Sequence, residues 1–308
     1  MVRLKQEKRH ILGLSGGKDS AALALYMREK HPYLDIEYFF TDTGSELPEV
    51  ETYLDMLESE LGKPIVRLQA KEVHHSDSDE GNKNGESVFG EIFKNVYNGF
   101  LPSPQSRWCT VQMKLKPLEK WVAPTLEAGG SIVSYIAIRA DEDRLGYNPP
   151  NPAITPKFPF IENGVDIFGV NEILEASGLG KPAYYDWRSR SGCTFCFYQQ
   201  KIEWVGLLER HPDKYEEAIE FEKHSIETSR KNGRSAFTWS QGETLEELAQ
   251  PERIEAIKED YQNRLARQQR RVPNALQIGL GNDQCSLDGL DELYDTSLDV
   301  SVCVTCHK

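Results

Sequence analysis

The sequence lacks long apolar runs and has no excess of positive charge. No stretch of its 308 residues reaches the roughly 18 consecutive apolar residues that a membrane-spanning helix needs. Its 36 Lys and Arg residues are outnumbered by 49 Asp and Glu residues, and the formal net charge is −13. Proteins that bind nucleic acid over their whole surface are normally basic, so we expect any nucleic-acid contact to be local or to pass through partner proteins.

A segment with the character of a secretory signal is also missing. The first residues, MVRLKQEKRH, are charged and precede only a short apolar stretch. We therefore expect a cytoplasmic protein with no membrane partner. In that reducing compartment, its six cysteines are not expected to form structural disulfides. Four of them form the C-x-x-C pairs CTFC (193–196) and CVTC (303–306), a pattern typical of metal sites, iron–sulfur clusters or thiol chemistry.

Strand-like and helix-like segments alternate in the first part of the chain. Short apolar runs predict strands at 10–14, 35–43, 64–70 and 131–140, and amphipathic patterns predict helices at 21–31, 47–62, 111–122 and 168–180. This alternation indicates an α/β fold, a parallel twisted sheet with helices on both faces. Residues 147–160 contain five prolines and are expected to be extended connecting chain. Residues 74–87 are polar and rich in Gly and Asn, which predicts a loop.

The character of the chain changes after Cys196. Residues 200–232 and 243–271 are charged and have helical periodicity. We therefore expect two parts, a nucleotide-binding core over residues 1–185 and a helical, cysteine-bearing region over residues 186–308. No internal repeat is present.

The stretch ILGLSGGKDS (11–20) places a Gly-rich turn between a strand and the start of a helix. It matches neither G-x-x-x-x-G-K-[ST] nor G-x-G-x-x-G. Backbone N–H groups at such a turn, together with the helix dipole, form an anion site. Gly16 and Gly17 allow close approach of the backbone, Lys18 adds charge, and Asp19 caps the helix or holds a magnesium-bound water. The residues assigned to this site are Ser15, Gly16, Gly17, Lys18, Asp19 and Ser20.

SGGKDS resembles the PP-loop of the ATP pyrophosphatase superfamily, which has the adenine nucleotide α-hydrolase-like fold. The resemblance implies that the loop grips the β- and γ-phosphates of ATP with Mg²⁺. It further implies that the bond beside the α-phosphorus is broken, that an acceptor oxygen is adenylated and that pyrophosphate leaves.

Two further stretches are similar to motifs of the PAPS reductase branch of that superfamily. FFTDTGSELPEV (39–50) resembles the motif of the second strand, which implies that Thr41, Asp42 and Thr43 contact the adenosine.

YIAIRADEDRLGY (135–147) is similar to the motif GIRxxES of the same branch, which implies that Arg139 reaches a phosphate and contributes to catalysis with Lys18 and Asp19. Ala137 and Asp143 depart from that motif. A surface ion pair with Glu142 is the alternative role for Arg139.

RWCTVQMKLKPLEKW (107–121) and RSGCTFC (190–196) resemble the two cysteine stretches of iron–sulfur APS/PAPS reductases. The resemblance implies a [4Fe–4S] cluster held by Cys109, Cys193 and Cys196. Thr110 stands where those reductases have a further cysteine, so one iron is open or a C-terminal cysteine is the fourth ligand, with Cys306 as our candidate. Zinc, which also accepts such ligands, and the absence of any metal are the alternatives.

The K-R-x-E-C-G-x-H segment of those reductases is missing, and the chain ends in DVSVCVTCHK. This combination resembles the reductase-like proteins of Dnd- and Ssp-type DNA phosphorothioation systems, and more distantly the cluster-bearing tRNA thiolases. It implies an enzyme that adenylates an acceptor oxygen for sulfur incorporation, with a cysteine desulfurase or another sulfur donor as partner and with DNA presented by partner proteins. The alternatives are a sulfonucleotide reductase that uses CVTC, a tRNA thiolation enzyme, and a nucleotide-binding subunit without catalytic activity or a cluster-based sensor.

Two short basic runs each have two possible roles. RLARQQRR (264–271) is a solvated helix face or a nucleic-acid contact. WRSR (187–190) leads into the second cysteine stretch, where an aromatic ring beside arginines either stacks on a nucleotide or packs in the core.

Overall fold

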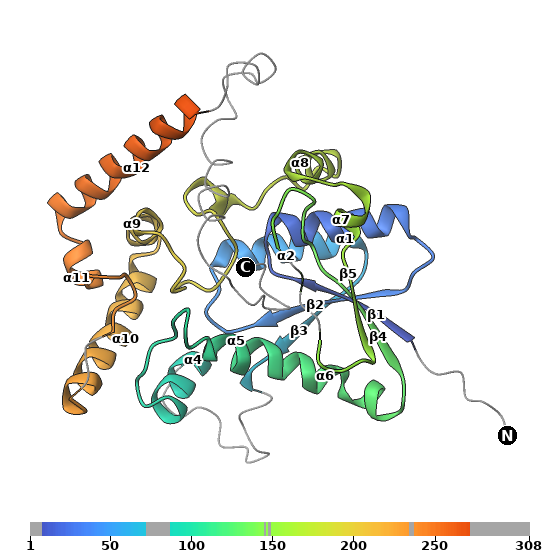
Figure 1. Ribbon diagram of the computed structural model, residues 1–308, viewed down its shortest axis with the longest axis horizontal. Coiled ribbons are helices and arrows are strands. Elements are labelled where there is room, and N and C mark those ends of the chain that lie inside the picture. Colours follow the sequence, from blue (N-terminus) through green and yellow to red (C-terminus); the bar gives the residue numbers. More distant parts are fainter. Residues whose placement is uncertain (1–7, 72–86, 145, 147–148, 234–236, 272–308) are drawn as a thin grey trace.

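A five-stranded parallel sheet forms the centre of the protein (Figure 1). The computed structural model describes residues 8–71, 87–144, 146, 149–233 and 237–271. The strands are β1 (Lys8–Leu14), β2 (Ile36–Asp42), β3 (Ile65–Gln69), β4 (Ser131–Tyr135) and β5 (Ile154–Lys157). Their order is β3-β2-β1-β4-β5, and every neighbouring pair is parallel. The predicted fold class is confirmed.

Helices cover both faces of the sheet because successive residues of each strand point to opposite sides. On one face, Leu12 and Phe40 belong to the main core beneath α1 and α2. On the other, Ile11 and Phe39 pack against α6 in a second, smaller cluster. The helices of these layers are α1 (Lys18–Lys30), α2 (Pro48–Leu61), α6 (Lys116–Glu127), α7 (Pro159–Asn163) and α8 (Ile167–Ala176). Figure 1 shows α1, α2, α7 and α8 on one side of the sheet and α6 on the other.

The predicted connecting chain at 147–160 was wrong in one place, because Ile154–Lys157 forms strand β5. This strand contains Pro156, which has no N–H to donate. Among the described strands β5 pairs only with β4, so it lies at an edge, where a proline is tolerated. Strand β4 is also shorter than expected and ends at Tyr135, so that Ile136–Arg139 leaves the sheet.

The predicted helix at 111–122 is the middle of a longer helical segment. It begins with α5 (Trp108–Thr110), continues through the π-helical turn η2 (Val111–Leu115) and ends as α6. Pro117 lies in the first turn of α6, where its missing N–H breaks no hydrogen bond of that helix.

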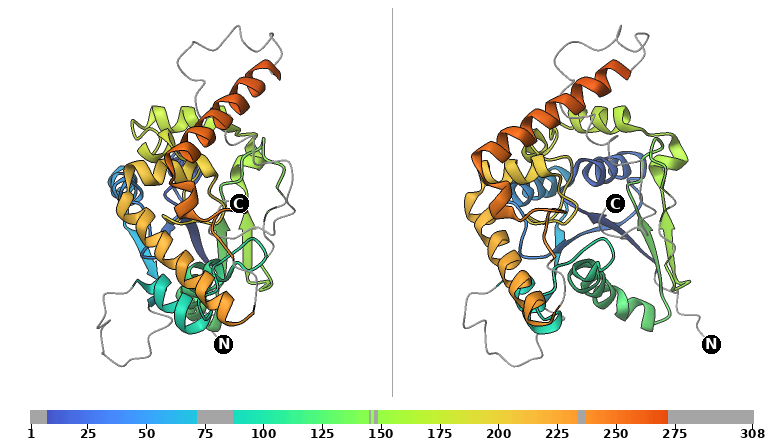
Figure 2. Two further views of the ribbon diagram at one scale, coloured as in Figure 1. Left: turned by 90° about the vertical axis from the view of Figure 1, so that its left-hand side faces the viewer. Right: turned by 60° about the vertical axis from the view of Figure 1, so that its left-hand side comes forward.

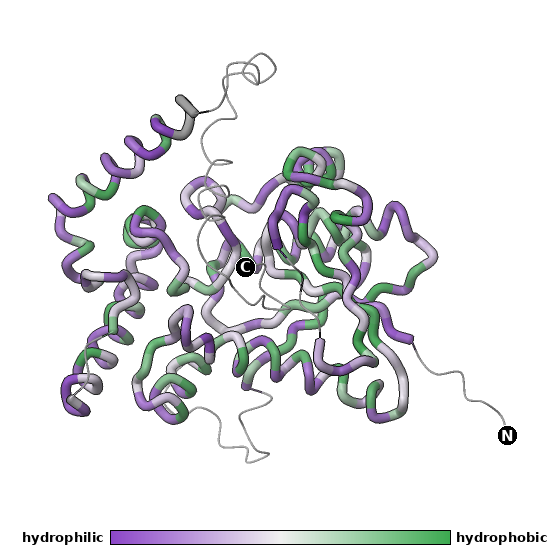
Figure 3. Tube along the Cα trace, viewed as in Figure 1, coloured by the Kyte–Doolittle hydropathy of each residue, from purple (hydrophilic) through white to green (hydrophobic). Residues whose placement is uncertain are grey.

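The two predicted C-terminal helical stretches are each divided in two. Residues 200–232 form α9 (Lys201–Arg210) and α10 (Pro212–Lys231), and residues 243–271 form α11 (Leu245–Leu248) and α12 (Pro251–Arg271). Pro212 and Pro251 begin the second helix of each pair, because proline has a suitable φ for a first helical turn but cannot continue a helix. These helices lie on one flank of the sheet (Figure 2), and Figure 3 shows hydrophilic residues along much of α12.

An aromatic cluster joins this flank to the sheet. Phe89, in the short helix α4 (Val88–Glu91), lies 4.9 Å from Phe195, 5.0 Å from Phe221 and 5.2 Å from Trp108 between ring centroids. The π-helical turn η1 (Ile92–Val96) adds Phe93, which lies 5.3 Å from Phe221. The buried core is therefore continuous across the predicted boundary at residue 185, and that boundary stays a prediction.

No described helix is long and apolar enough to cross a membrane.

Because the aromatic cluster connects residues from both predicted parts, we expect the chain to unfold in a single thermal transition. Phe89→Ala should lower the free energy of unfolding by about 3–5 kcal/mol, the usual cost of deleting a buried aromatic ring. Scanning calorimetry measures both effects. Phe168→Ala is the matched control, since that ring is 58% exposed. Two separate transitions, only one of them shifted by Phe89→Ala, would show that the two parts fold independently.

Candidate functional site

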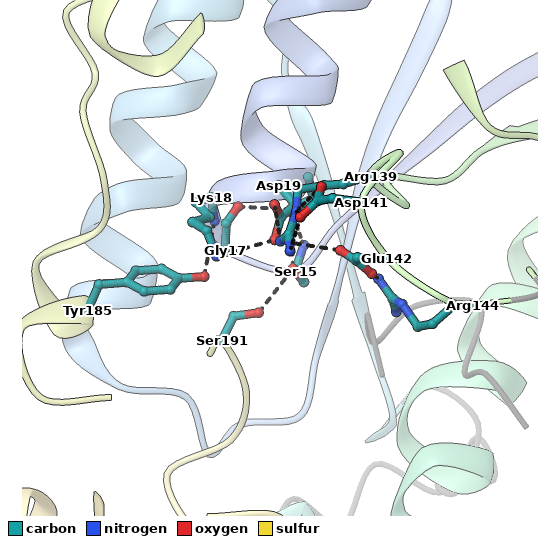
Figure 4. Close-up of polar contacts among 12 residues, drawn as sticks. Ser15, Gly17, Lys18, Asp19, Arg139, Asp141, Glu142, Arg144, Tyr185 and Ser191 are labelled. Carbon is teal, nitrogen blue, oxygen red and sulfur yellow. Dashed lines mark hydrogen bonds and ion pairs between the residues drawn. The ribbon is translucent and has the colours of Figure 1, made fainter. Parts of the chain in front are cut away.

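The candidate site lies at the carboxyl ends of β1 and β4. The sheet order reverses between these two strands, and such a switch point opens a crevice in which α/β proteins bind ligands. The turn Ser15–Gly17 follows β1, and the segment ending in Arg139 follows β4. The strands therefore place the predicted anion loop and the predicted arginine side by side (Figure 4).

The loop has the backbone that its glycines predict. Gly16 has a φ of 72°, a left-handed conformation, and a Cβ there would lie 2.5 Å from Cγ1 of Val50. The hydroxyl of Ser20 accepts a hydrogen bond from the N–H of Ser15 at 3.1 Å and donates to the carbonyl of Gly17 at 3.1 Å. The N-cap residue, Gly17, has no side chain to cap α1, and the start of a helix is a general anion site.

Four charged groups of opposite sign meet at this loop. The buried Lys18 ammonium lies 3.7 Å from Oδ2 of Asp19, and Nη1 of Arg139 donates to Oδ1 of Asp19 at 3.1 Å. Nε of Arg139 also donates to Oδ1 of Asp141 at 3.1 Å. Asp19 was predicted either to cap α1 or to hold a magnesium-bound water. It does not cap α1, and its ion pair with Arg139 joins the loop to the segment after β4.

Arg139 does pair with Glu142, at 3.3 Å, but not on the surface, because only 8% of the arginine is exposed. Glu142 in turn pairs with Arg144. Burial works against the charged form of Arg139, but the carboxylates of Asp19 and Asp141 outweigh it and raise the pKa of the guanidinium. This arginine is a permanent cation beside the phosphate loop.

The segment 184–191 makes hydrogen bonds to the outer side of the loop. Its residues were not among those predicted for the site. The Tyr184 hydroxyl donates to the carbonyl of Gly16 at 2.8 Å, and the N–H of Lys18 donates to the Tyr185 hydroxyl at 3.4 Å. The Lys18 ammonium lies 5.0 Å from the centroid of the Tyr185 ring. Ser191 donates to the Ser15 hydroxyl at 3.1 Å. The only signal for these contacts was that Ser191 lies within RSGCTFC.

The residues predicted to contact adenosine lie at the end of β2. Thr41 is buried within the strand. The Asp42 carboxylate accepts hydrogen bonds from the N–H of Gly44 and from the amide of Gln69, at 2.7 and 2.8 Å. Thr43 lies at the cysteine stretch, where its hydroxyl donates to Glu46 at 2.7 Å and lies 3.4 Å from Sγ of Cys193. The adenosine contacts themselves stay a prediction.

The three cysteines predicted as metal ligands gather in one region. Cys193 lies near enough to Cys196 for their charges to interact, and Cys196 and Cys109 both add to the raised pKa of Tyr198, whose main cause is burial. Burial also raises the pKa of Cys193 to about 12, against the attraction of Lys114. Cys193 is therefore a neutral thiol at pH 7 unless a metal ion replaces its proton.

No group of three Cys, His, Asp or Glu side chains among the described residues lies close enough together to hold a metal ion. These residues on their own therefore do not complete the predicted cluster site. The predicted fourth ligand, Cys306, and the other C-terminal cysteines, Cys285 and Cys303, lie outside the described residues.

Buried polar side chains make hydrogen bonds to the backbone in and just before the second cysteine stretch. Nη2 of Arg188, which is fully buried, donates to the carbonyl of Cys193 at 2.7 Å. The buried carboxylate of Glu203 accepts from both the N–H and the hydroxyl of Ser189 at 2.7 Å. Trp187 packs against Gly206, where a Cβ would lie 2.6 Å from the indole. Of the two roles open to Trp187 and Arg188, the structure supports packing.

Comparison with known proteins finds a similarity that covers the strands and loops of this site. Residues 9–145 match the family model of the phosphoadenosine phosphosulfate (PAPS) reductase domain. This part of the chain is therefore similar to a PAPS reductase domain. The match includes the anion loop, β1 to β4 and Arg139, and therefore joins the elements that form the candidate site. It supports an enzyme of the adenine nucleotide α-hydrolase-like group and nucleotide-related sulfur chemistry.

Two curated relatives of this chain are proteins whose names state no function. An uncharacterized 37.8 kDa protein of Escherichia phage 186 is 26% identical over 271 residues, which cover 74% of this chain and 78% of the relative. An uncharacterized protein of Methanocaldococcus jannaschii is 28% identical over 138 residues, which cover 45% of this chain and 24% of the relative. A crystal structure of PAPS reductase from Candida auris in complex with phosphate has a TM-score of 0.41 and 14% identity, over 62% of this chain and 83% of that one.

The carboxyl group of Glu46 makes stability depend on pH. Burial, only partly offset by the hydrogen bond from Thr43, raises its pKa from 4.5 to about 7. A carboxyl with a raised pKa in the folded state stabilises the protein below its unfolded pKa, and this contribution is lost as the pH rises through the folded pKa. We therefore expect the free energy of unfolding to fall by up to about 3 kcal/mol between roughly pH 4.5 and pH 7 because of this group.

Urea unfolding of the wild type and of Glu46→Gln at a series of pH values measures this contribution. The amide cannot ionise but still accepts from Thr43, so the difference between the two proteins should grow up to about pH 7 and then level off. Parallel pH profiles would contradict the assignment.

Proposed function

We propose that this chain is an ATP pyrophosphatase that adenylates an acceptor oxygen so that sulfur can replace it, most specifically in DNA phosphorothioation. The observation that carries the proposal is the hydrogen bond of 3.1 Å between Ser191 and Ser15. It joins the phosphate loop directly to the segment that continues into Cys193. A site for nucleotide activation and a cysteine stretch suited to sulfur chemistry therefore adjoin each other.

The loop has the groups that hold a polyphosphate. The uncapped start of α1 presents N–H donors, and Lys18 and Arg139 present two cations on opposite sides of Asp19. In the proposed reaction these groups bind the β- and γ-phosphates and offset the negative charge that develops as pyrophosphate leaves. Asp19 is the carboxylate beside the phosphates that is suited to a magnesium-bound water.

The reaction has two steps. An oxygen of the acceptor phosphate attacks the α-phosphorus of ATP, the bond between the α- and β-phosphates breaks, and pyrophosphate leaves. A sulfur nucleophile then attacks the acceptor phosphorus, and AMP leaves with the oxygen that sulfur replaces. Without the first step the leaving group would be an oxide or hydroxide ion, which leaves poorly.

The sulfur is proposed to come from a cysteine desulfurase as a persulfide. Its terminal sulfur attacks the acceptor, and a second thiol then attacks the inner sulfur, which frees the thiophosphate and leaves a disulfide for an external thiol to reduce. Cys193 as described is a neutral thiol because its pKa is raised, whereas a nucleophile has to be a thiolate. A cluster bound with the help of Cys109, Cys193 and Cys196 would supply the positive charge that keeps these sulfurs deprotonated.

The family match favours one second candidate, a sulfonucleotide reductase, because the matching domain is named for PAPS reduction. Release of sulfite from APS or PAPS distinguishes the two reactions.

Lys18→Ala should abolish pyrophosphate release from ATP, with a fall in rate of at least about 100-fold, the usual effect of removing one charge-stabilising group. The assay detects pyrophosphate and AMP in the presence of nucleic acid and a persulfide donor. Lys30→Ala is the matched control, because Lys30 lies at the far end of the same helix and is exposed. Release of orthophosphate and ADP by the wild type would overturn the proposal.

The predicted cluster has a spectroscopic test. Protein purified without oxygen should be brown, with a broad visible absorption band and bound iron, and Cys193→Ser should lose both. Circular dichroism on the same samples separates loss of the cluster from loss of the fold. A colourless wild-type protein that contains stoichiometric zinc would replace the cluster with a zinc site.

A further inference from the structure

A second cavity, separate from the phosphate loop, opens between the helices of the C-terminal flank. Its volume is about 880 Å³, and it lies between the start of α9, the loop 237–242 and α12. This volume is within the range of small-molecule binding sites. None of the residues of the phosphate loop lines it, so it is not part of the site described above.

Residues next to both cysteine stretches contribute to the wall of this cavity. Gln105 lies four residues before Cys109, and Phe197 directly follows Cys196. A molecule bound in the cavity is therefore held by the same two pieces of chain that carry the thiols. Exposed residues at the rim, Gln105 and Gln241, leave the cavity open to solvent.

Gln199 is the feature that indicates a ligand. It lines the cavity and is only 8% exposed, yet neither the oxygen nor the nitrogen of its side-chain amide has a hydrogen-bond partner. Buried polar groups in folded proteins are nearly always paired, so an unpaired amide beside a cavity can pair with a molecule that enters. The two amide atoms have almost no accessible surface, so this pairing requires the Gln199 side chain to turn toward the cavity. An amide presents one acceptor and one donor side by side, which matches the edge of a nucleobase.

The other walls of the cavity suit a nucleotide too. The rings of Phe197 and Phe237 are half-buried there, and base–aromatic stacking is a general way to bind unpaired bases. Lys201 and Arg253 both pair with Glu243, so their charges are already balanced. Arg264 lies at the wall, where its Nη1 donates to Oε1 of Gln200 at 3.3 Å and its Nε pairs with Asp260, which also lines the cavity, at 3.1 Å.

Arg264 is also the first residue of the basic run RLARQQRR, which ends α12. In a chain with a net charge of −13, this run is a local concentration of positive charge in the sequence, and its first residue, Arg264, lines the cavity. A strand whose phosphates follow the basic end of α12 could place one base in the cavity. An extended basic run favours a strand with several phosphates over a free mononucleotide or an acidic peptide as the ligand of this cavity.

We propose that this cavity binds one unpaired nucleotide of the nucleic-acid strand that accepts sulfur. The base lies between the aromatic rings and the Gln199 amide, and the adjoining phosphates lie along the end of α12. The identity of this strand as the sulfur acceptor rests on the proposed function, whereas its binding to the cavity does not.

The test compares the wild type with Gln199→Leu, using fluorescence anisotropy of a short labelled single strand and of the same strand with abasic sites. Leucine removes an unpaired buried polar group, so the melting temperature should stay equal or rise. Affinity for the intact strand should fall about tenfold, the scale of one lost base contact. Affinity for the abasic strand should not change. Gln250→Leu, an exposed residue outside the cavity, should change none of these.

Several outcomes would overturn the proposal. A lower melting temperature with unchanged binding would show that the Gln199 amide is structural. Equal affinity of the wild type for intact and abasic strands would place no base in the cavity, and displacement of the strand by an equal charge of polyglutamate would identify the site as one for acidic peptides. Binding of the DNA or the RNA strand supports the proposal, and binding of neither excludes it. The assay contains no ATP, so a failure of pyrophosphate release leaves its result intact.

Discussion

The contact between the phosphate loop and the segment 184–191 determines the arrangement of the whole site. A strand, a Gly-rich turn and a helix form an anion site in many proteins, and that local arrangement depends on residues close in sequence. Here the outside of the turn is held by Tyr184, Tyr185 and Ser191, about 170 residues further along the chain. The same segment then turns into the cysteine stretch, so one set of hydrogen bonds fixes the position of both chemical parts.

The buried polar groups beneath the cysteine stretch make this arrangement rigid. Arg188 and Glu203 are almost without exposure, and each is hydrogen-bonded to the backbone of the segment 189–193. Glu203 also accepts from the N–H of Gln200 at 2.8 Å and so begins α9. The helical flank and the sheet are thereby joined through a polar contact as well as through the aromatic cluster around Phe89.

The parts of the fold that depend on local pattern were predictable from the sequence. Alternation of short apolar runs with amphipathic stretches predicted the parallel sheet, and Gly62, with a φ of 63°, ends α2 where a glycine stop was expected. Strand β5 was missed because Pro156 is a negative signal for any strand and only the position at an edge makes it acceptable. The shared location of Lys18, Asp19 and Arg139 followed from a resemblance to known motifs and not from periodicity.

The contacts of Tyr184 and Tyr185 were not predictable, because no local pattern indicates which distant backbone group a tyrosine will meet. Gly17 shows what such a contact implies for related sequences. A Cβ at this position would lie 2.8 Å from the Ser191 hydroxyl and 3.2 Å from that of Tyr185. A side chain at residue 17 therefore requires the side chains at positions 185 and 191 to shift or to become smaller. In an alignment of relatives, these three positions should covary, although 167 or more residues separate the first from the other two.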